Sequence, residues 1–211
     1  MPEPSSNPLR KSYISLFILL GIFLLPACAV KPIHRETQPI EQNISPVRSV
    51  IEHGDWVVIR GVTGPDNLIG AATNMPFSHA SIYDAENDQV IEADSHGVHL
   101  TSLEEYLGSA SRVWIIKPMW ATPETRPLAV ERARALLGRP YDFTGVIGLG
   151  LPDRYYCSEL VMAVWKPFRA KNPMQNPIPL VISPGRLHHW GRVVYDSMEI
   201  GFGVVPEPKK P

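Results

Sequence analysis

The stretch Tyr155-Tyr156-Cys157-Ser158-Glu159-Leu160 predicts the start of a helix with a cysteine in its first turn. Apolar side chains then recur at helical spacing, at Leu160, Val161, Val164 and Trp165. Pro167 ends the pattern. The macrodipole and the free N–H groups at a helix N-terminus favour a thiolate over a thiol. Cys157 is therefore a candidate nucleophile.

An earlier segment offers a base and a carboxylate. Residues 79–83 and 89–93 are typical of two strands that flank a turn at 84–88, which predicts a β-hairpin. If the connecting loop has two or four residues, His79 and Glu92 share one face and lie opposite or diagonal to each other. A loop of three residues would separate them.

These three residues have the chemistry of a cysteine hydrolase. Such an enzyme needs a thiolate, an imidazole that moves protons and a polar group that orients the imidazole, and Cys157, His79 and Glu92 could fill these roles. On spacing alone the alternative stays open, because a lone cysteine in a helix is more often an apolar core residue.

The rest of the chain between residues 50 and 205 predicts one α+β domain. Further strands are expected at residues 55–60, 97–100, 113–117, 193–195 and 200–205. Further helices are expected at residues 66–74, 103–107 and 127–137, with Gly138 at a left-handed cap position. Helices and strands do not alternate as βαβ units, which favours the α+β class.

Several short segments resemble, in order, the motifs of the bacterial permuted papain-like amidases, the YaeF/YiiX group of the NlpC superfamily. They are Gly54-Asp55, Ser78-His79-Ala80-Ser81-Ile82-Tyr83, Val90-Ile91-Glu92-Ala93, Leu137-Gly138-Arg139-Pro140-Tyr141-Asp142, Tyr156-Cys157-Ser158-Glu159-Leu160 and Ile182-Ser183-Pro184. The resemblance implies a circularly permuted papain-like (NlpC-like) fold, in which a small antiparallel sheet packs on the nucleophile-bearing helix. The base precedes the nucleophile here, the reverse of papain, as a permutation requires.

The same resemblance implies the site residues. Cys157 would be the nucleophile, His79 the base and Glu92 the orienting group. Tyr141 and Tyr156 are candidates for substrate binding or oxyanion assistance, with packed aromatic residues as the alternative. The backbone N–H of Cys157 is the expected main oxyanion donor.

Other polar residues have simpler interpretations. His96 and His99 are expected to be surface residues near the hairpin exit, and His188-His189 lack a third ligand at a recognised spacing. We expect no metal and no other cofactor.

The composition excludes other classes of protein. The 211 residues carry 20 basic and 21 acidic side chains, a net charge of −1, which argues against a nucleic-acid partner. Two cysteines cannot form a disulfide scaffold. With 44% hydrophobic residues the chain can build a core despite its 22 prolines.

The N-terminal region predicts export. Arg10-Lys11 precede an apolar run at residues 13–25, which at ~20 Å is short for a permanent membrane span. Leu25-Pro26-Ala27-Cys28 then resembles the lipobox of bacterial lipoproteins. This implies removal of residues 1–27 and a lipid anchor (acyl chains such as palmitate) on Cys28, and Ala29 favours the outer membrane. An ordinary signal peptide with a chance cysteine is the alternative.

Proline-containing polar segments flank the domain. Residues 28–49 show no periodic apolar face and predict a flexible tether, and residues 206–211 predict a disordered tail. We therefore expect a monomeric envelope lipoprotein that hydrolyses an amide bond, in peptidoglycan peptides or in an acyl amide. Two alternatives remain: an acyl-lipid amidase or acyltransferase, and a non-catalytic envelope binding module with the same fold.

Overall fold

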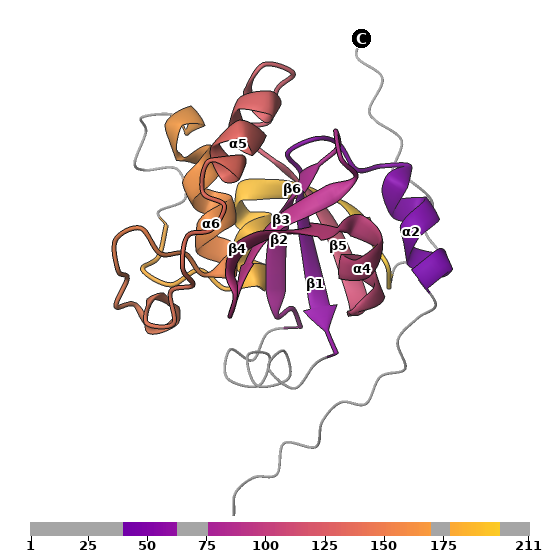
Figure 1. Cartoon of the computed structure of the whole chain (residues 1–211). Helices are drawn as coiled ribbons and strands as arrows, with labels where there is room; N and C mark the ends of the chain where they lie inside the picture. The colour runs from indigo at the N-terminus through magenta and orange to yellow at the C-terminus, as the bar shows by residue number, and fades with distance from the viewer. Residues whose placement is uncertain (1–39, 63–75, 170–177, 199–211) are drawn as a thin grey trace, which may run out of the picture. The chain divides into compact units, whose positions relative to one another are not determined.

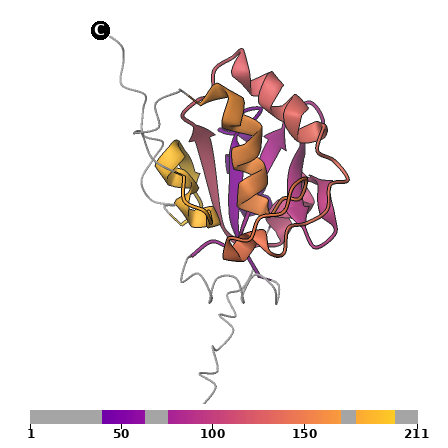
Figure 2. The ribbon, with the colours of Figure 1, turned by 90° about the vertical axis from the view of Figure 1, so that its left-hand side faces the viewer.

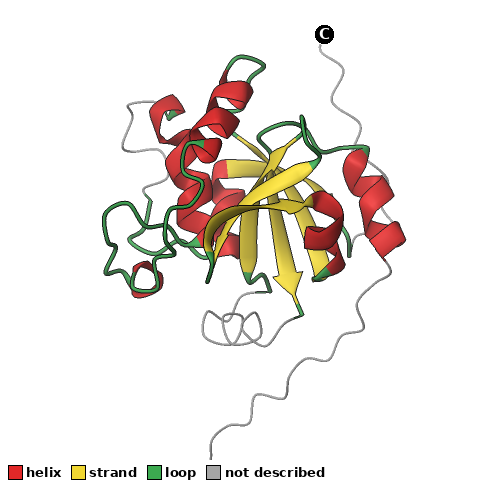
Figure 3. Ribbon diagram, viewed as in Figure 1, coloured by secondary structure: helices red, strands yellow, loops and turns green. Residues whose placement is uncertain are grey.

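The computed structural model describes residues 40–62, 76–169 and 178–198 (Figure 1). Its centre is an antiparallel sheet with strand order β4-β3-β2-β1-β5-β6 (Figure 3). The strands are β1 Trp56–Gly61, β2 His79–Asp84, β3 Gln89–Asp94, β4 Gly97–Ser102, β5 Ala110–Pro118 and β6 Gly191–Asp196. This agrees with the predicted α+β class and with the strands predicted within the described residues.

Helices cover both faces of this sheet. The α-helices are α2 Ile40–Arg48, α4 Leu103–Gly108, α5 Thr125–Arg134 and α6 Cys157–Trp165. Short 3-10 helices lie at Gly145–Ile147, Lys166–Phe168 and Pro184–Trp190. Figure 2 shows α6 lying across the strands with α5 beside it, while α2 and α4 lie on the opposite face in Figure 1. The central strand β1 is apolar at consecutive positions because both of its faces are covered.

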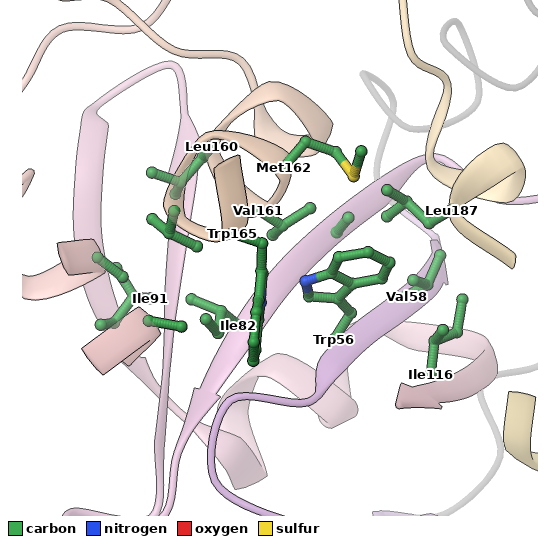
Figure 4. Packing of buried hydrophobic residues seen from close by; sticks show 14 of the residues in the cluster. Trp56, Val58, Ile82, Ile91, Ile116, Leu160, Val161, Met162, Trp165 and Leu187 are labelled. Carbon is green, nitrogen blue, oxygen red and sulfur yellow. The ribbon is translucent and has the colours of Figure 1, made fainter. Parts of the chain in front are cut away.

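The larger core lies between the sheet and α6. Trp56 and Val58 of β1, with Ile82 of β2, pack against Leu160 and Trp165 of the helix (Figure 4). Val57 and Ile59 alternate with them and face the smaller core beneath α2 and α4. The apolar face predicted for residues 160–165 thus fixes the position of α6, and with it the position of Cys157.

The predicted tether was wrong over its C-terminal part. Residues 40–48 form helix α2 instead of a flexible segment, and Val47 is fully buried in the core beside α4. Ile44, Val47 and Ile51 are spaced as one helical face, a pattern that the internal Pro46 disguises. Burial of that face stabilises the helix despite the backbone hydrogen bond that Pro46 cannot donate.

Two further differences concern element ends. Helix α5 ends at Arg134, three residues before its predicted end, and Gly138 follows the intervening turns with a φ of +80°, the left-handed conformation predicted for it. The helix predicted at 66–74 and the strand predicted at 200–205 lie outside the described residues. Over the part of the chain that the structure describes, no helix has the length and apolarity needed to cross a bilayer.

A buried ion pair joins α5 to the start of β1. The guanidinium of Arg126 donates to the fully buried carboxylate of Asp55 at 2.7 Å and to the carbonyl of His53 at 2.6 Å. Burial raises the pKa of Asp55 to about 6, although the charge of Arg126 opposes the shift. Because the folded state raises this pKa, the contribution of Asp55 to stability is greatest at low pH and falls as pH rises through about 6.

We predict that Arg126→Met destabilises the protein by about 3 kcal/mol at pH 7.5, because the Asp55 carboxylate is left buried without its partner. The loss should be smaller at pH 5, where Asp55 is protonated. Urea denaturation at both pH values measures this, with the exposed Arg154→Met as the control. Equal losses at the two pH values would show that the charge of Asp55 is not the cause.

Candidate active site

The β2–β3 hairpin brings His79 and Glu92 together. Asp84 pairs with Gln89, so the connecting loop has four residues, 85–88, the parity under which His79 and Glu92 share a face. Ser81 is the residue opposite Glu92, and His79 lies diagonal to it. His79 Nε2 and Glu92 Oε2 are 2.6 Å apart. The predicted contact between the imidazole and the carboxylate is therefore confirmed.

The third residue, Cys157, comes from helix α6. Helix α6 begins at Cys157, and its packing on β2 brings the thiol to the start of that strand. The hydroxyl of Ser158 lies 3.7 Å from the Cys157 sulfur, and the pKa values of Cys157 and His79 shift partly because each group is a charge and hydrogen-bond partner of the other. Because Nε2 of His79 is taken by Glu92, Nδ1 is the ring atom left for the thiol. Cys157 thus interacts with His79, and His79 with Glu92.

Electrostatics among these three residues favour charged side chains. Burial alone would raise the pKa of the Cys157 thiol, but the charge and hydrogen bond of His79 outweigh it, and that pKa is lowered. Burial alone would lower the pKa of His79, yet Cys157 and Glu92 raise it well above its ordinary value. Burial opposes ionisation of Glu92 too, but hydrogen bonds from His79 and Thr101 lower its pKa. Each of the three shifts thus favours the charged form of its side chain.

The first turn of α6 supplies a place for negative charge. Cys157 is the first helical residue, so its N–H has no acceptor within the helix. The helix macrodipole, which is positive at its N-terminus, also favours a negative charge there. An oxyanion formed by attack of Cys157 would lie beside this N–H, as the sequence predicted.

The two predicted tyrosines lie around the nucleophile. Tyr156 precedes α6 and is buried, and its hydroxyl accepts the N–H of Ile182 at 3.0 Å. Tyr141 forms an isolated bridge with Tyr155, and burial together with the negative charge of Cys157 raises its pKa. Tyr156 thus has a packing role whatever its chemistry, and a part for either tyrosine in substrate binding stays a prediction.

Asp142 organises the loop ahead of the nucleophile, a role not anticipated from the sequence. Its fully buried carboxylate accepts the N–H groups of Thr144 at 3.0 Å, Gly145 at 2.8 Å and Leu151 at 2.9 Å. A Cβ on Gly145 would approach that carboxylate to 2.6 Å and the ring of Tyr156 to 2.9 Å. The loop therefore packs tightly against the residue that precedes Cys157. The sequence signal that could have indicated this role is the pair Tyr141-Asp142 with three glycines nearby.

A family model described as permuted papain-like amidase enzyme, YaeF/YiiX, matches residues 50–178. The chain belongs to this family of permuted papain-like amidases. The match spans β1 to β5, α6 and the residues Cys157, His79 and Glu92. The mixed structure with its antiparallel sheet on α6 is the permuted papain-like fold expected from the motifs.

The chain is also similar to a solved structure. It is described as the crystal structure of metalloprotein yiiX from Escherichia coli O157:H7, with 24% identity and a TM-score of 0.47 over 55% of this chain. The alignment covers 65% of that protein, so this chain spans about two thirds of its length. Among curated proteins no sequence matches.

An apolar rim surrounds the amidase site on one side. Phe143, Ile147, Leu149 and Leu180 are between 63% and 80% exposed. The ring of Phe143 lies 4.9 Å from that of Tyr141, and Leu180 is so near Gly148 that a Cβ there would approach it to 2.9 Å. The rim, which we define as residues 143–151 with Leu180, is thus connected to the nucleophile through Tyr141.

Of the other histidines predicted at the surface, His99 differs from its predicted place and His96 agrees with it. His99 is half-buried and its Nε2 lies 3.6 Å from Glu92 Oε1, so it belongs to the site's surroundings. His96 is exposed and contacts Asp94. The rings of His188 and His189 are 4.2 Å apart. Among the residues that the structure describes, no three His, Cys, Asp or Glu side chains are grouped to hold a metal ion.

We predict that iodoacetamide alkylates Cys157 rapidly at pH 6, because His79 lowers the pKa of the thiol. In His79→Ala the rate at pH 6 should fall at least about tenfold, since one unit of pKa changes the thiolate fraction by that factor. Mass spectrometry of the peptide that carries Cys157 measures the rate. His189→Ala serves as the control. Alkylation with an ordinary thiol titration in both variants and the wild type would contradict the ion pair.

Proposed function

We propose that this amidase is a cysteine hydrolase with Cys157 as nucleophile, His79 as acid and base, and Glu92 as orienting group. The observation that carries the proposal is the 2.6 Å contact of His79 with Glu92, together with the mutual effect of Cys157 and His79 on their pKa values. A binding module with the same fold would need neither a lowered thiol pKa nor a carboxylate aligned on the histidine. The non-catalytic alternative is therefore the weaker one.

The geometry suggests the order of steps. The Cys157 thiolate attacks the amide carbonyl, and the oxyanion is stabilised by the N–H of Cys157. His79 then gives its proton to the leaving nitrogen, the C–N bond breaks, and an acyl thioester with a free amine results. Neutral His79 next takes a proton from water, whose oxygen attacks the thioester. The C–S bond breaks, releasing a carboxylic acid and restoring the thiolate and imidazolium.

Glu92 acts on His79 throughout this cycle. Its contact with Nε2 fixes the ring so that Nδ1 faces the sulfur. Its negative charge stabilises the imidazolium in the resting ion pair. Glu92 therefore orients the base and does not contact the substrate.

For the substrate, we propose the amide bond of a peptidoglycan peptide. Support comes from the predicted export of the chain, which would place the enzyme where such peptides occur. An acyl amide is the second candidate. The observation that favours it is the apolar rim, where four large side chains are exposed on or next to a loop that packs against Tyr141 and Tyr156. An aliphatic chain would bury them at about 0.8 kcal/mol per CH₂ group, whereas a charged peptide would not.

We predict that Cys157→Ala abolishes hydrolysis and that Glu92→Gln lowers kcat at least about a hundredfold, because neutral Gln cannot support the imidazolium. Glu104→Gln, on the exposed side of α4, is the matched control. Purified muropeptides and acyl amides of increasing chain length are incubated with the full-length protein and analysed by mass spectrometry.

Activity on the two kinds of compound distinguishes the peptidoglycan peptide from the acyl amide as substrate. Release of free amine from muropeptides supports the first. A kcat/KM that rises with acyl length and is reduced by Ile147→Ser supports the second. Activity that survives in Cys157→Ala with either substrate would overturn the cysteine mechanism.

We further propose that the protein is a monomeric lipoprotein anchored through Cys28 in the outer membrane and facing the periplasm. The charged, apolar and small-residue order of residues 10–28 supports this. More than one acyl chain would be needed for stable attachment, because a single chain binds only marginally.

We predict that cells supplied with an alkyne analogue of palmitate label the wild-type protein and not Cys28→Ala. Cys157→Ala, which leaves the proposed anchor intact, should be labelled like the wild type. Equal labelling of Cys28→Ala would show that the lipid is attached at another residue.

A further inference from the structure

His79 uses only one oxygen of the Glu92 carboxylate, and strand β4 faces the other. Thr101 Oγ1 donates a hydrogen bond to Glu92 Oε1. His99 Nε2 lies 3.6 Å from the same oxygen. Glu92 is only 7% exposed, so water does little to hold its second oxygen. A donor on β4 must therefore satisfy it.

The sheet register places both β4 side chains on the face of Glu92. His99 is the direct cross-strand partner of Glu92, and Thr101 is opposite Val90, two residues away along each strand. Because side chains alternate along a strand, residues 90, 92, 99 and 101 share one face. His79 reaches the same carboxylate from β2. The carboxylate is thus held between two neighbouring strands.

Of the two β4 groups, only Thr101 is a permanent donor. His99 Nδ1 lies 3.0 Å from the carbonyl oxygen of Gly97, which can only accept, so Nδ1 carries the proton. Nε2 of a neutral His99 is then an acceptor and cannot bond Glu92. It becomes a donor only when His99 is protonated. The hydroxyl of Thr101 donates at any pH.

We propose that Thr101 is a positioning residue that fixes the Glu92 carboxylate so that Oε2 is presented to His79. The proposal rests on the function proposed for Cys157, His79 and Glu92. Without the hydroxyl, Oε1 loses its permanent donor and the carboxylate can turn away from His79. The imidazolium is then less well supported, and the Cys157 thiol becomes harder to ionise.

Several titratable groups contact Glu92 or act on it through His79. His79 faces it from β2 and His99 from β4, Asp94 of its own strand lies 3.5 Å from His99 Nδ1, and Cys157 of α6 acts through His79. The ring of Tyr106 from α4 lies 5.8 Å from that of His79.

The experiment compares Thr101→Val, which keeps the shape and suits a strand, with Thr101→Ser, which keeps the hydroxyl. Alkylation of Cys157 by iodoacetamide is measured from pH 4 to 9 in the full-length protein, with thermal denaturation as the check of folding. Thr101→Val should raise the midpoint of the alkylation profile by roughly one pH unit and slow alkylation at the wild-type midpoint about fivefold. Thr101→Ser should stay within about twofold of the wild type. Thr101→Ala replaces the Val variant if that protein is not folded.

Each outcome decides the question. A folded Thr101→Val with the wild-type profile overturns the positioning role, provided that the wild type itself alkylates readily at low pH. Thr101→Ser impaired as much as Thr101→Val overturns it too, because packing of the methyl group would then be the cause. An ordinary thiol titration in the wild type instead overturns the proposed function, whatever the Thr101 variants do.

Discussion

The contact between His79 Nε2 and Glu92 Oε2, at 2.6 Å, is the interaction on which the rest of the site depends. It holds an ionised carboxylate in a place where water can barely reach it, a costly arrangement unless each oxygen has a partner. Three strands must therefore keep a fixed register, because β2 supplies the imidazole, β3 the carboxylate and β4 the second donor. A slip of one residue in either pairing would turn these groups to the opposite face.

Helix α6 meets two requirements with one short sequence. Its apolar residues bury against Trp56 and Ile82, while its first residue must reach the beginning of β2. Packing alone would allow the helix to shift along its axis. The start is fixed by groups outside the helix: Tyr156 is bound to the backbone of Ile182, and the loop closed by Asp142 packs against the same tyrosine. These contacts convert a hydrophobic interface into a defined position for one sulfur atom.

The residues that could be predicted are those whose role shows in local patterns. The alternation in the β2–β3 hairpin and the apolar face of α6 predicted the strands, the helix and the contact of His79 with Glu92, whereas the roles of Cys157, His79 and Glu92 were implied by the resemblance of their motifs to a family. Helix α2 was missed because Pro46 interrupts its pattern, and its stability comes from Val47 packing on α4, which only the folded chain reveals. Asp142 and Thr101 were missed because hydrogen bonds from loop N–H groups or to a distant carboxylate leave no periodic signal.

A charged third residue has consequences that a neutral one would not. An amide side chain could orient His79 equally well, but it would not stabilise the imidazolium. Cys157 and the carboxylate of Glu92 both raise the pKa of His79, so in the proposed mechanism Glu92 would help to keep the ring protonated beside the thiolate. The Glu92 carboxylate must also stay ionised although it is buried. A histidine that contacts only one of its oxygens stabilises this charge incompletely. A buried Glu in this position therefore requires a donor on its far side, and the chemistry of the pair extends from α6 through β2 and β3 as far as β4.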